Sequence, residues 1–178
     1  MKSVLMSIRP KWCELIASGK KTVEVRKSRP KLETPFKVYI YETKDKKFEN
    51  IGIHWEDGKT FEHNIGKVIG EFVCDKVTMS FVGYDEKGCP SYWDIFDGSC
   101  LTANELVCYG QFKTLYGWHI SDLVIYDNPK SLGEFFKACD KPKGTDCSVC
   151  VDHRENRCKA ITRPPQSWCY VEEVNGND

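Results

Sequence analysis

The hydrophobic and polar positions at the start of the chain predict a strand followed by a helix. Residues 3–8 (SVLMSI) are mostly apolar, which is typical of a short buried strand. Pro10 suits the first position of a helix, because its missing N–H would have no partner there. Apolar residues then recur with the spacing of one helical face until Gly19, a residue that commonly ends helices. We therefore expect a helix between Pro10 and Gly19.

The next segment, residues 21–27 (KTVEVRK), alternates between apolar and polar side chains. Side chains of a strand point alternately to its two faces, so Val23 and Val25 are expected to face the core. Glu24 and Arg26 are then expected on the opposite face. The pattern predicts a half-buried strand with one apolar and one polar face.

The rest of the chain contains four further strand patterns and two helix patterns. Strands are expected at residues 36–43, 67–81, 116–127 and 167–174, helices at 101–110 and 128–139, a long hairpin or insertion at 44–65 and a long loop at 83–100. Thr102 and Glu105 have the spacing of a capping box at the first helix, and Ser131 is expected to cap the second. About six strands with two or three short helices, not in regular alternation, predict a small α+β barrel.

The composition indicates a soluble globular protein. Of its 178 residues 40% are hydrophobic and 29% charged, which suits a single domain spanning 1–178. No stretch reaches the roughly 18 apolar residues that cross a bilayer, and the apolar run at the start is too short for a signal peptide, so we expect a cytoplasmic protein with no membrane partner. In that compartment the ten cysteines are expected to be reduced thiols or metal ligands.

The formal net charge is zero, so contact with a nucleic acid requires a local basic patch. Residues 9–26 contain such a patch: the turn and strand bring Lys21 and Arg26 near Glu24, with Arg9 and Trp12 close by. One interpretation is a basic cleft. The other is an ordinary exposed ion pair, because most surface ion pairs have no function.

The segment IRPKWCELIASGKKTVEVRK, together with the later GKVIGEF, YGWHISDL and PPQSWCYVEE, resembles the ASCH domain family, and in particular a phage and Firmicute subgroup. Members of this family resemble PUA domains. The resemblance implies a PUA-like small β-barrel that binds RNA or a modified nucleoside. In this chain the expected ligand contacts are Arg9, Trp12, Lys21, Glu24 and Arg26.

Some ASCH proteins are amidohydrolases that remove the acetyl group of 4-acetylcytidine, and the resemblance makes this an alternative function. Their lysine corresponds to Lys21, and the candidate for their helix carboxylate is Glu105, which has a structural explanation as a capping residue. Either would have to activate water or a nucleophile. Their strand threonine corresponds to Glu24, a departure that favours binding over hydrolysis.

Trp118 is a further candidate ligand contact, because an aromatic ring that opens a strand can stack on a base. His119 beside it could also face a base, although a lone histidine in a strand is more often structural.

A second cluster lies in residues 139–158, where Cys139, Cys147, Cys150 and Cys158 surround a C-x2-C pair. Four thiolates complete the tetrahedral set of a structural zinc site, with His153 as an alternative fourth ligand. Unligated thiols, an iron–sulfur cluster and a disulfide stay open. The cluster predicts a zinc-binding, Cys-rich appendage before the last strand, and it allows a second alternative function, that of a zinc-stabilised protein-interaction adaptor.

Overall fold

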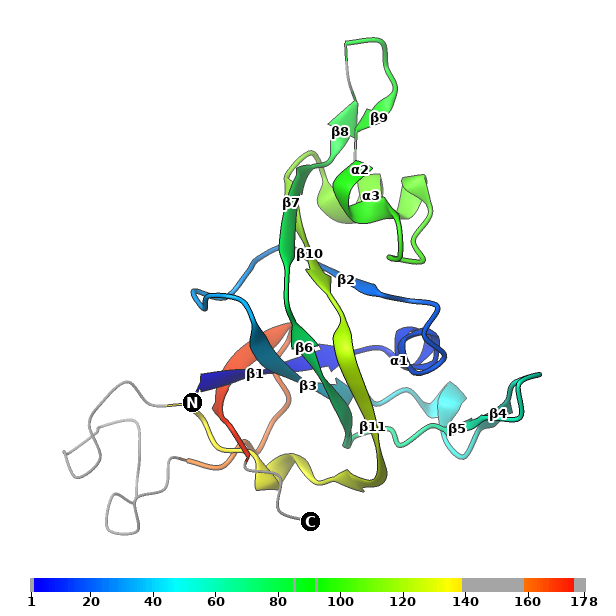
Figure 1. The fold of residues 1–178 in the computed structure, drawn as a ribbon, viewed down its shortest axis with the longest axis vertical. Coiled ribbons are helices and arrows are strands. Elements are labelled where there is room, and N and C mark those ends of the chain that lie inside the picture. The colour runs from blue at the N-terminus through cyan, green and yellow to red at the C-terminus, as the bar shows by residue number, and fades with distance from the viewer. Residues whose placement is uncertain (1, 85, 92, 139–158, 175–178) are drawn as a thin grey trace, which may run out of the picture. The chain divides into compact units, whose positions relative to one another are not determined.

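The computed structural model describes residues 2–84, 86–91, 93–138 and 159–174. Most of its regular structure is β-strand (Figure 1). In chain order the elements are β1 (Lys2–Ile8), α1 (Pro10–Ala17), β2 (Val23–Arg26), β3 (Phe36–Glu42), β4 (Gly52–His54), β5 (Thr60–Glu62), β6 (Val68–Cys74), β7 (Val77–Phe81), β8 (Gly83–Tyr84), β9 (Pro90–Ser91), α2 (Trp93–Phe96), α3 (Ala103–Gly110), β10 (Thr114–His119), β11 (Ser121–Lys130) and β12 (Trp168–Glu172). Two short 3₁₀ turns, Lys46–Phe48 and Leu132–Glu134, complete the set.

The described residues form two compact units. The first takes its residues from the ranges Met1–Pro10, Lys37–Glu71 and Val124–Asp178, and the second from Lys11–Phe36 and Phe72–Leu123. Each unit has its own buried apolar cluster.

The first unit is organised by a five-stranded sheet with the order β11-β6-β3-β1-β12. β1 pairs in parallel with β3 and antiparallel with β12, so Val4 lies opposite Val38 on one side and Tyr170 on the other. The core residues of this unit, all at most 3% exposed, are Leu5, Tyr39, Tyr41, Val68, Phe135, Ile161 and Val171. Burial on both faces explains why β1 and β3 are nearly continuous apolar runs in the sequence.

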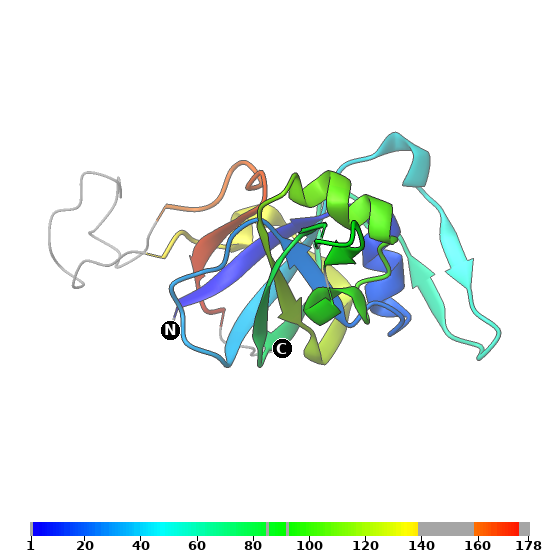
Figure 2. The same ribbon diagram turned by 90° about the horizontal axis from the view of Figure 1, so that it is seen from above.

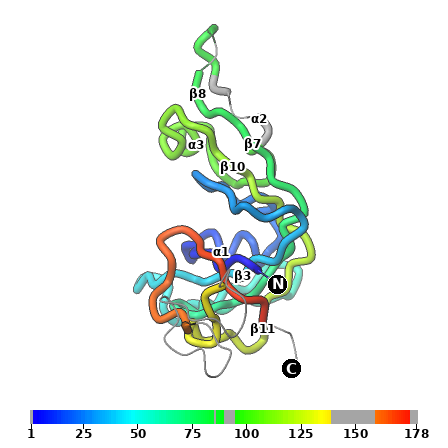
Figure 3. Tube along the Cα trace, turned by 90° about the vertical axis from the view of Figure 1, so that its left-hand side faces the viewer, coloured from blue at the N-terminus to red at the C-terminus, as the bar shows by residue number. Residues whose placement is uncertain are grey.

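The second unit contains an antiparallel sheet with the order β2-β10-β7. Figure 3 shows β7 and β10 running alongside each other, with α3 beside them. The core of this unit consists of Val25, Val82, Ile95, Leu106 and Leu115, with Val23 packed against it.

The predicted hairpin at 44–65 is confirmed as the antiparallel pair β4 and β5, in which Ile53 lies opposite Phe61. Figure 2 shows this hairpin projecting away from the strands of the first unit. The predicted capping box is also present, with Thr102 as the N-cap of α3 and Glu105 three residues later.

The predicted barrel is not closed in the described residues, because both principal sheets have free ends in their strand order. The two long predicted strands are each two strands. Residues 67–81 divide at Asp75 into β6 and β7, and residues 116–127 divide at Ile120 into β10 and β11. In each case the two halves belong to different sheets, an exchange that hydrophobic alternation alone does not reveal.

The predicted helix at 128–139 is wrong over its described part. Ser131 precedes only the 3₁₀ turn Leu132–Glu134, after which the chain is extended. Phe136 then forms an antiparallel bridge with Ala160, and Phe135 enters the core of the first unit. Burial of this phenylalanine therefore overrides the local helical pattern. The Cys-rich appendage predicted at 139–158 lies outside the described residues.

No helix in the described part of the chain combines the length and apolarity needed to cross a membrane.

Gly70 on β6 provides a test of the packing between β6 and β11. A Cβ atom at this position would collide with the carbonyl oxygen of Val124 and lie 3.2 Å from the Cα atom of Ile125. Because the backbone cannot yield easily, we expect Gly70→Ala to lower the free energy of unfolding by about 1 to 3 kcal/mol in urea denaturation. Gly133→Ala is the control, since a Cβ there meets nothing within 4 Å. Equal stability of the two variants would contradict this account of the packing.

Candidate functional site

The site is built on the turn between α1 and β2. Gly19 has a φ of +73°, a conformation that favours glycine, and its N–H donates to the Ile16 carbonyl. The N–H of Lys21 then donates to the Leu15 carbonyl at 2.9 Å. These bonds end the helix and fix the direction in which Lys21 leaves it.

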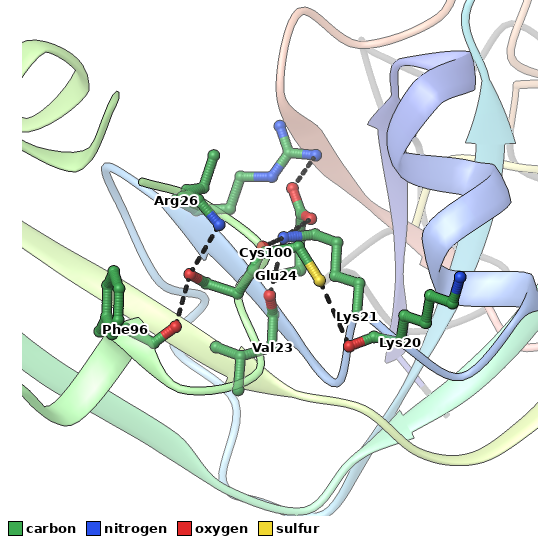
Figure 4. A network of polar contacts seen from close by, with 9 residues as sticks. Lys20, Lys21, Val23, Glu24, Arg26, Phe96 and Cys100 are labelled. Atoms are coloured by element: carbon green, nitrogen blue, oxygen red, sulfur yellow. Dashed lines mark hydrogen bonds and ion pairs between the residues drawn. The ribbon is translucent and has the colours of Figure 1, made fainter. Parts of the chain in front are cut away.

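The Lys21 side chain is only 2% exposed and its ammonium group is held by the protein itself (Figure 4). Nζ donates to the Ser99 carbonyl at 2.5 Å and to the Val23 carbonyl at 2.9 Å, and it lies 3.4 Å from Glu24 Oε2. The two carbonyls accept two of the three N–H donors of the ammonium group, and the contact with Glu24 is an ion pair. Lys21 therefore joins the start of β2 to a loop 78 residues away.

Glu24 is the carboxylate of the cluster and is also buried, at 6% exposed. Its Oε1 lies 3.0 Å from Nη2 of Arg26, whose side chain is 11% exposed. Oε2 faces Lys21, but no described residue donates a hydrogen bond to this oxygen. The cluster thus holds two cations, one anion and a buried acceptor atom without a donor.

This burial changes the expected picture of β2. Val25 is 5% exposed, as predicted for its core face, yet Glu24 on the opposite face is equally buried. Of the two interpretations of this patch, the ordinary exposed ion pair is therefore wrong at Glu24. Its cross-strand neighbour on β10 is Trp118, and this bulky ring lies on the same face.

A loop that follows α2 closes the cluster from the other side. The carbonyl of Gly98 accepts from the N–H groups of Thr22 and Val23, and Gly98 has a φ of +75°. Ser99 is fully buried, and its hydroxyl donates to the Phe96 carbonyl at 2.7 Å and accepts from the N–H of Leu101. Figure 4 also shows Cys100, whose thiol lies 3.3 Å from the Lys20 carbonyl. Sequence reasoning missed Ser99, because it participates through its main-chain carbonyl; the Gly-Ser pair at 98–99 was the only signal.

Trp12 on α1 adds an aromatic ring to the cluster. The Nζ atoms of Lys11 and Lys21 lie 4.5 Å and 5.1 Å from the centre of this ring, within the range of cation–π attraction. Lys11 is exposed, whereas Lys21 is buried. Trp12 and Lys11 are therefore the part of the site that reaches solvent.

Glu105 lies at the start of α3, and its carboxylate is engaged in the capping box. Oε2 accepts from the Thr102 N–H at 2.8 Å and from the Thr102 hydroxyl at 2.9 Å. These hydrogen bonds, with a smaller contribution from the charge of Lys11, hold the pKa of Glu105 below its ordinary value. A carboxylate with a lowered pKa is a weaker base, so the geometry favours the structural interpretation of Glu105.

Two other predicted contacts lie elsewhere. Trp118 is fully buried and packs edge-on against Phe36, with ring centres 5.5 Å apart, so the prediction that it stacks on a base is corrected to a core role. Arg9 is exposed and belongs to the first unit, directly before α1. The structure thus brings together Trp12, Lys21, Glu24 and Arg26.

The predicted zinc ligands Cys139, Cys147, Cys150 and Cys158 lie outside the described residues. Within the described part of the chain, no group of three or more His, Cys, Asp or Glu side chains is arranged to hold a metal ion.

Comparison with known proteins agrees with the arrangement of these elements. The family model of the ASCH domain matches residues 6–107, more than half of the 178-residue chain. A search of curated proteins finds no match to the sequence.

Among solved structures, the chain is similar to the crystal structure of ASCH from Zymomonas mobilis, with a TM-score of 0.57 and 18% identity, covering 96% of this chain and 88% of that one. Two point-mutant structures of the same protein give TM-scores of 0.57 and 0.56 at 16% and 17% identity. They cover 96% and 97% of this chain, and 89% and 92% of the Zymomonas mobilis chains. At these identities the likeness concerns the fold.

The buried cluster makes a prediction about stability. Glu24→Gln leaves Lys21 and Arg26 without their shared anion, and removing one partner of a buried ion pair typically costs about 3 to 5 kcal/mol. We expect a loss of this size in the free energy of unfolding, measured with urea. The control is Asp57→Asn, which removes the charge from the exposed Lys59–Asp57 pair and should change nothing measurable. If both variants unfold like the parent protein, the cluster is not a buried ionic network.

The capping role of Glu105 predicts a dependence on pH. Its folded-state pKa is lowered, so the stabilisation from its ionised form is complete above the ordinary value of 4.5 and disappears as the pH falls through the lower folded value. Glu105→Gln retains a capping side chain without that charge. The stability difference between the parent protein and this variant should therefore shrink on acidification below pH 4.5, as followed by thermal unfolding. A difference that is independent of pH would rule out the ionised cap.

Proposed function

The chain belongs to the ASCH domain family, and we propose that it binds RNA or a modified nucleoside at the cluster formed by Trp12, Lys21, Glu24 and Arg26. The observation that carries this proposal is the charge of the buried cluster, in which two cations share one carboxylate. The whole chain is neutral, so this excess positive charge is a local feature. A phosphate group supplies the missing negative charge.

The contacts give the cations of the cluster different roles. Lys21 donates to the Ser99 and Val23 carbonyls and is ion-paired with Glu24, so it acts as a positioning residue that holds the carboxylate and the loop. The phosphate is then contacted by Arg26, whose guanidinium has five N–H donors, and by the exposed Lys11. This assignment differs from the sequence-based expectation that Lys21 itself grips the ligand.

Glu24 contributes by holding the cations in place. Its Oε2 atom is buried and lies 3.4 Å from Nζ of Lys21, and its Oε1 atom lies 3.0 Å from Nη2 of Arg26. The carboxylate therefore orients the Arg26 guanidinium for a phosphate contact. Trp12 provides an adjacent ring on which a base can stack.

The same geometry favours binding over hydrolysis of 4-acetylcytidine. Position 24 carries a carboxylate where the amidohydrolases have a threonine. The chain has a threonine two residues earlier, Thr22, but its hydroxyl packs closely against Gly98. Glu105 is engaged with Thr102. A role as a zinc-stabilised adaptor rests on the cysteines of 139–158, and metal analysis of the purified protein tests that separately.

The binding proposal is tested with exposed and partly buried cations. We expect Lys11→Ala to weaken binding of a fluorescein-labelled RNA in anisotropy titrations and to reduce the slope of log K against log salt by about 0.7, the value for one lost phosphate contact on a single strand. Arg26→Gln should lower the affinity by about tenfold or more, because a charge-assisted contact is lost. Circular dichroism checks that this variant is folded.

Lys46→Ala is the matched control, since Lys46 is an exposed lysine of the first unit. It should leave both the affinity and the salt slope unchanged. If the three variants bind alike, or if the parent protein binds no RNA even at low salt, the proposal is wrong.

A further inference from the structure

The face of the β2-β10-β7 sheet that carries Arg26 also carries exposed apolar side chains. In the register of β2, β10 and β7, Tyr116 lies between Arg26 on one side and Met79 on the other, and Thr114 lies opposite Phe81. Residues directly opposite one another point to the same face, as do residues two apart on one strand. Arg26, Tyr116, Met79 and Phe81 therefore share one face of the sheet.

The opposite face confirms this assignment. Val25 and Leu115 alternate with Arg26 and Tyr116 along their strands, and both are buried in the core of the second unit. The face that carries Met79 and Phe81 is thus the one directed away from that core cluster.

This outer face changes from buried to exposed along its length. At one end lie Glu24 and Trp118, which are buried. Toward the other end, Met79 is 65% exposed and Phe81 is 56% exposed, while Tyr116 between the strands is partly exposed. Exposing two neighbouring large apolar side chains to water is unfavourable, and a ligand that covers them removes this cost.

The charge of this face indicates which kind of molecule covers it. β7 (VTMSF) carries no charged side chain. On this face of the described strands, the carboxylate is that of Glu24, and it is paired with Arg26 and Lys21. The guanidinium of Arg26 therefore gives the face a positive character. Aromatic and apolar side chains beside a cation are the combination that binds single-stranded nucleic acid.

We infer that Met79, Phe81 and Tyr116 form a stacking platform for the unpaired bases of an RNA strand whose phosphate is held at Arg26. This inference rests on the proposed function and specifies its ligand as single-stranded. Met79 and Phe81 are two residues apart on an extended strand, about 6.6 Å, so each contacts a separate base. In a duplex the base faces are stacked on one another and do not reach such a platform.

The experiment compares two labelled RNAs of about ten nucleotides, an unstructured strand and a self-complementary duplex. The parent protein should bind the single strand more tightly. Phe81→Ala should weaken binding of the single strand by about fivefold or more, as expected for one lost stacking contact, and leave the salt slope unchanged because no ionic contact is removed. Phe81→Trp, which keeps an aromatic face, should restore the affinity. Both residues replace an exposed side chain, so the fold is retained.

The control is Phe112→Ala, because Phe112 is similarly exposed, at 60%, but follows α3 and packs near Tyr84 with ring centres 6.0 Å apart. It should bind both RNAs like the parent protein. Equal weakening by Phe112→Ala and Phe81→Ala, or no weakening by Phe81→Ala, overturns the platform. Equal affinity of the parent protein for strand and duplex also overturns it.

These failures are distinguishable from failure of the proposed function. If the platform is wrong but the function is right, the parent protein still binds RNA and Lys11→Ala still weakens it. If the parent protein binds neither RNA, both are wrong. Light scattering tests the other possible occupant of this face, a second copy of the chain. A dimer that Phe81→Ala dissociates, with RNA affinity unchanged, assigns the face to a protein partner and overturns the inference.

Discussion

The contact on which the second unit depends is the buried ammonium group of Lys21. It is bound by the carbonyls of Ser99 and Val23 and by the carboxylate of Glu24, so one side chain joins the end of α1, the start of β2 and the loop after α2. A buried ammonium is tolerated only when its donors are satisfied, which obliges these three segments to keep their positions. The order of the site is thus a consequence of one electrostatic requirement.

The same requirement orients the groups that face a ligand. Because Lys21 holds one oxygen of Glu24, the other oxygen is directed at Arg26, and the guanidinium is placed in the row that continues through Tyr116 to Met79. The charged cluster and the exposed apolar face are therefore parts of one sheet surface. A cation at the boundary between them suits a ligand that is anionic along its backbone and apolar on its bases.

Local patterns predicted most elements well where an element stays within one sheet. The strands β1, β2 and β3, the helix α1, the capped helix α3 and the hairpin at 44–65 follow from periodicity, Gly19 and the Thr102 capping box. The errors occur where the chain leaves one sheet for another, at Asp75 and Ile120, or where Phe135 is drawn into the core. Both halves of a strand that changes sheets contain apolar residues at strand-like positions, so periodicity alone does not show the exchange.

For the site, the sequence by itself determined which groups are near one another along the chain. Gly19 sets the turn, and the spacing of Lys21, Glu24 and Arg26 places three charges on the turn and the short strand that follows it. Only the tertiary structure decided their roles. The partner of Lys21 is a main-chain carbonyl 78 residues away, which side-chain chemistry does not mark. Likewise Trp118 and Phe81 are both aromatic residues of strands, and only the packing around the sheet buries the first and exposes the second.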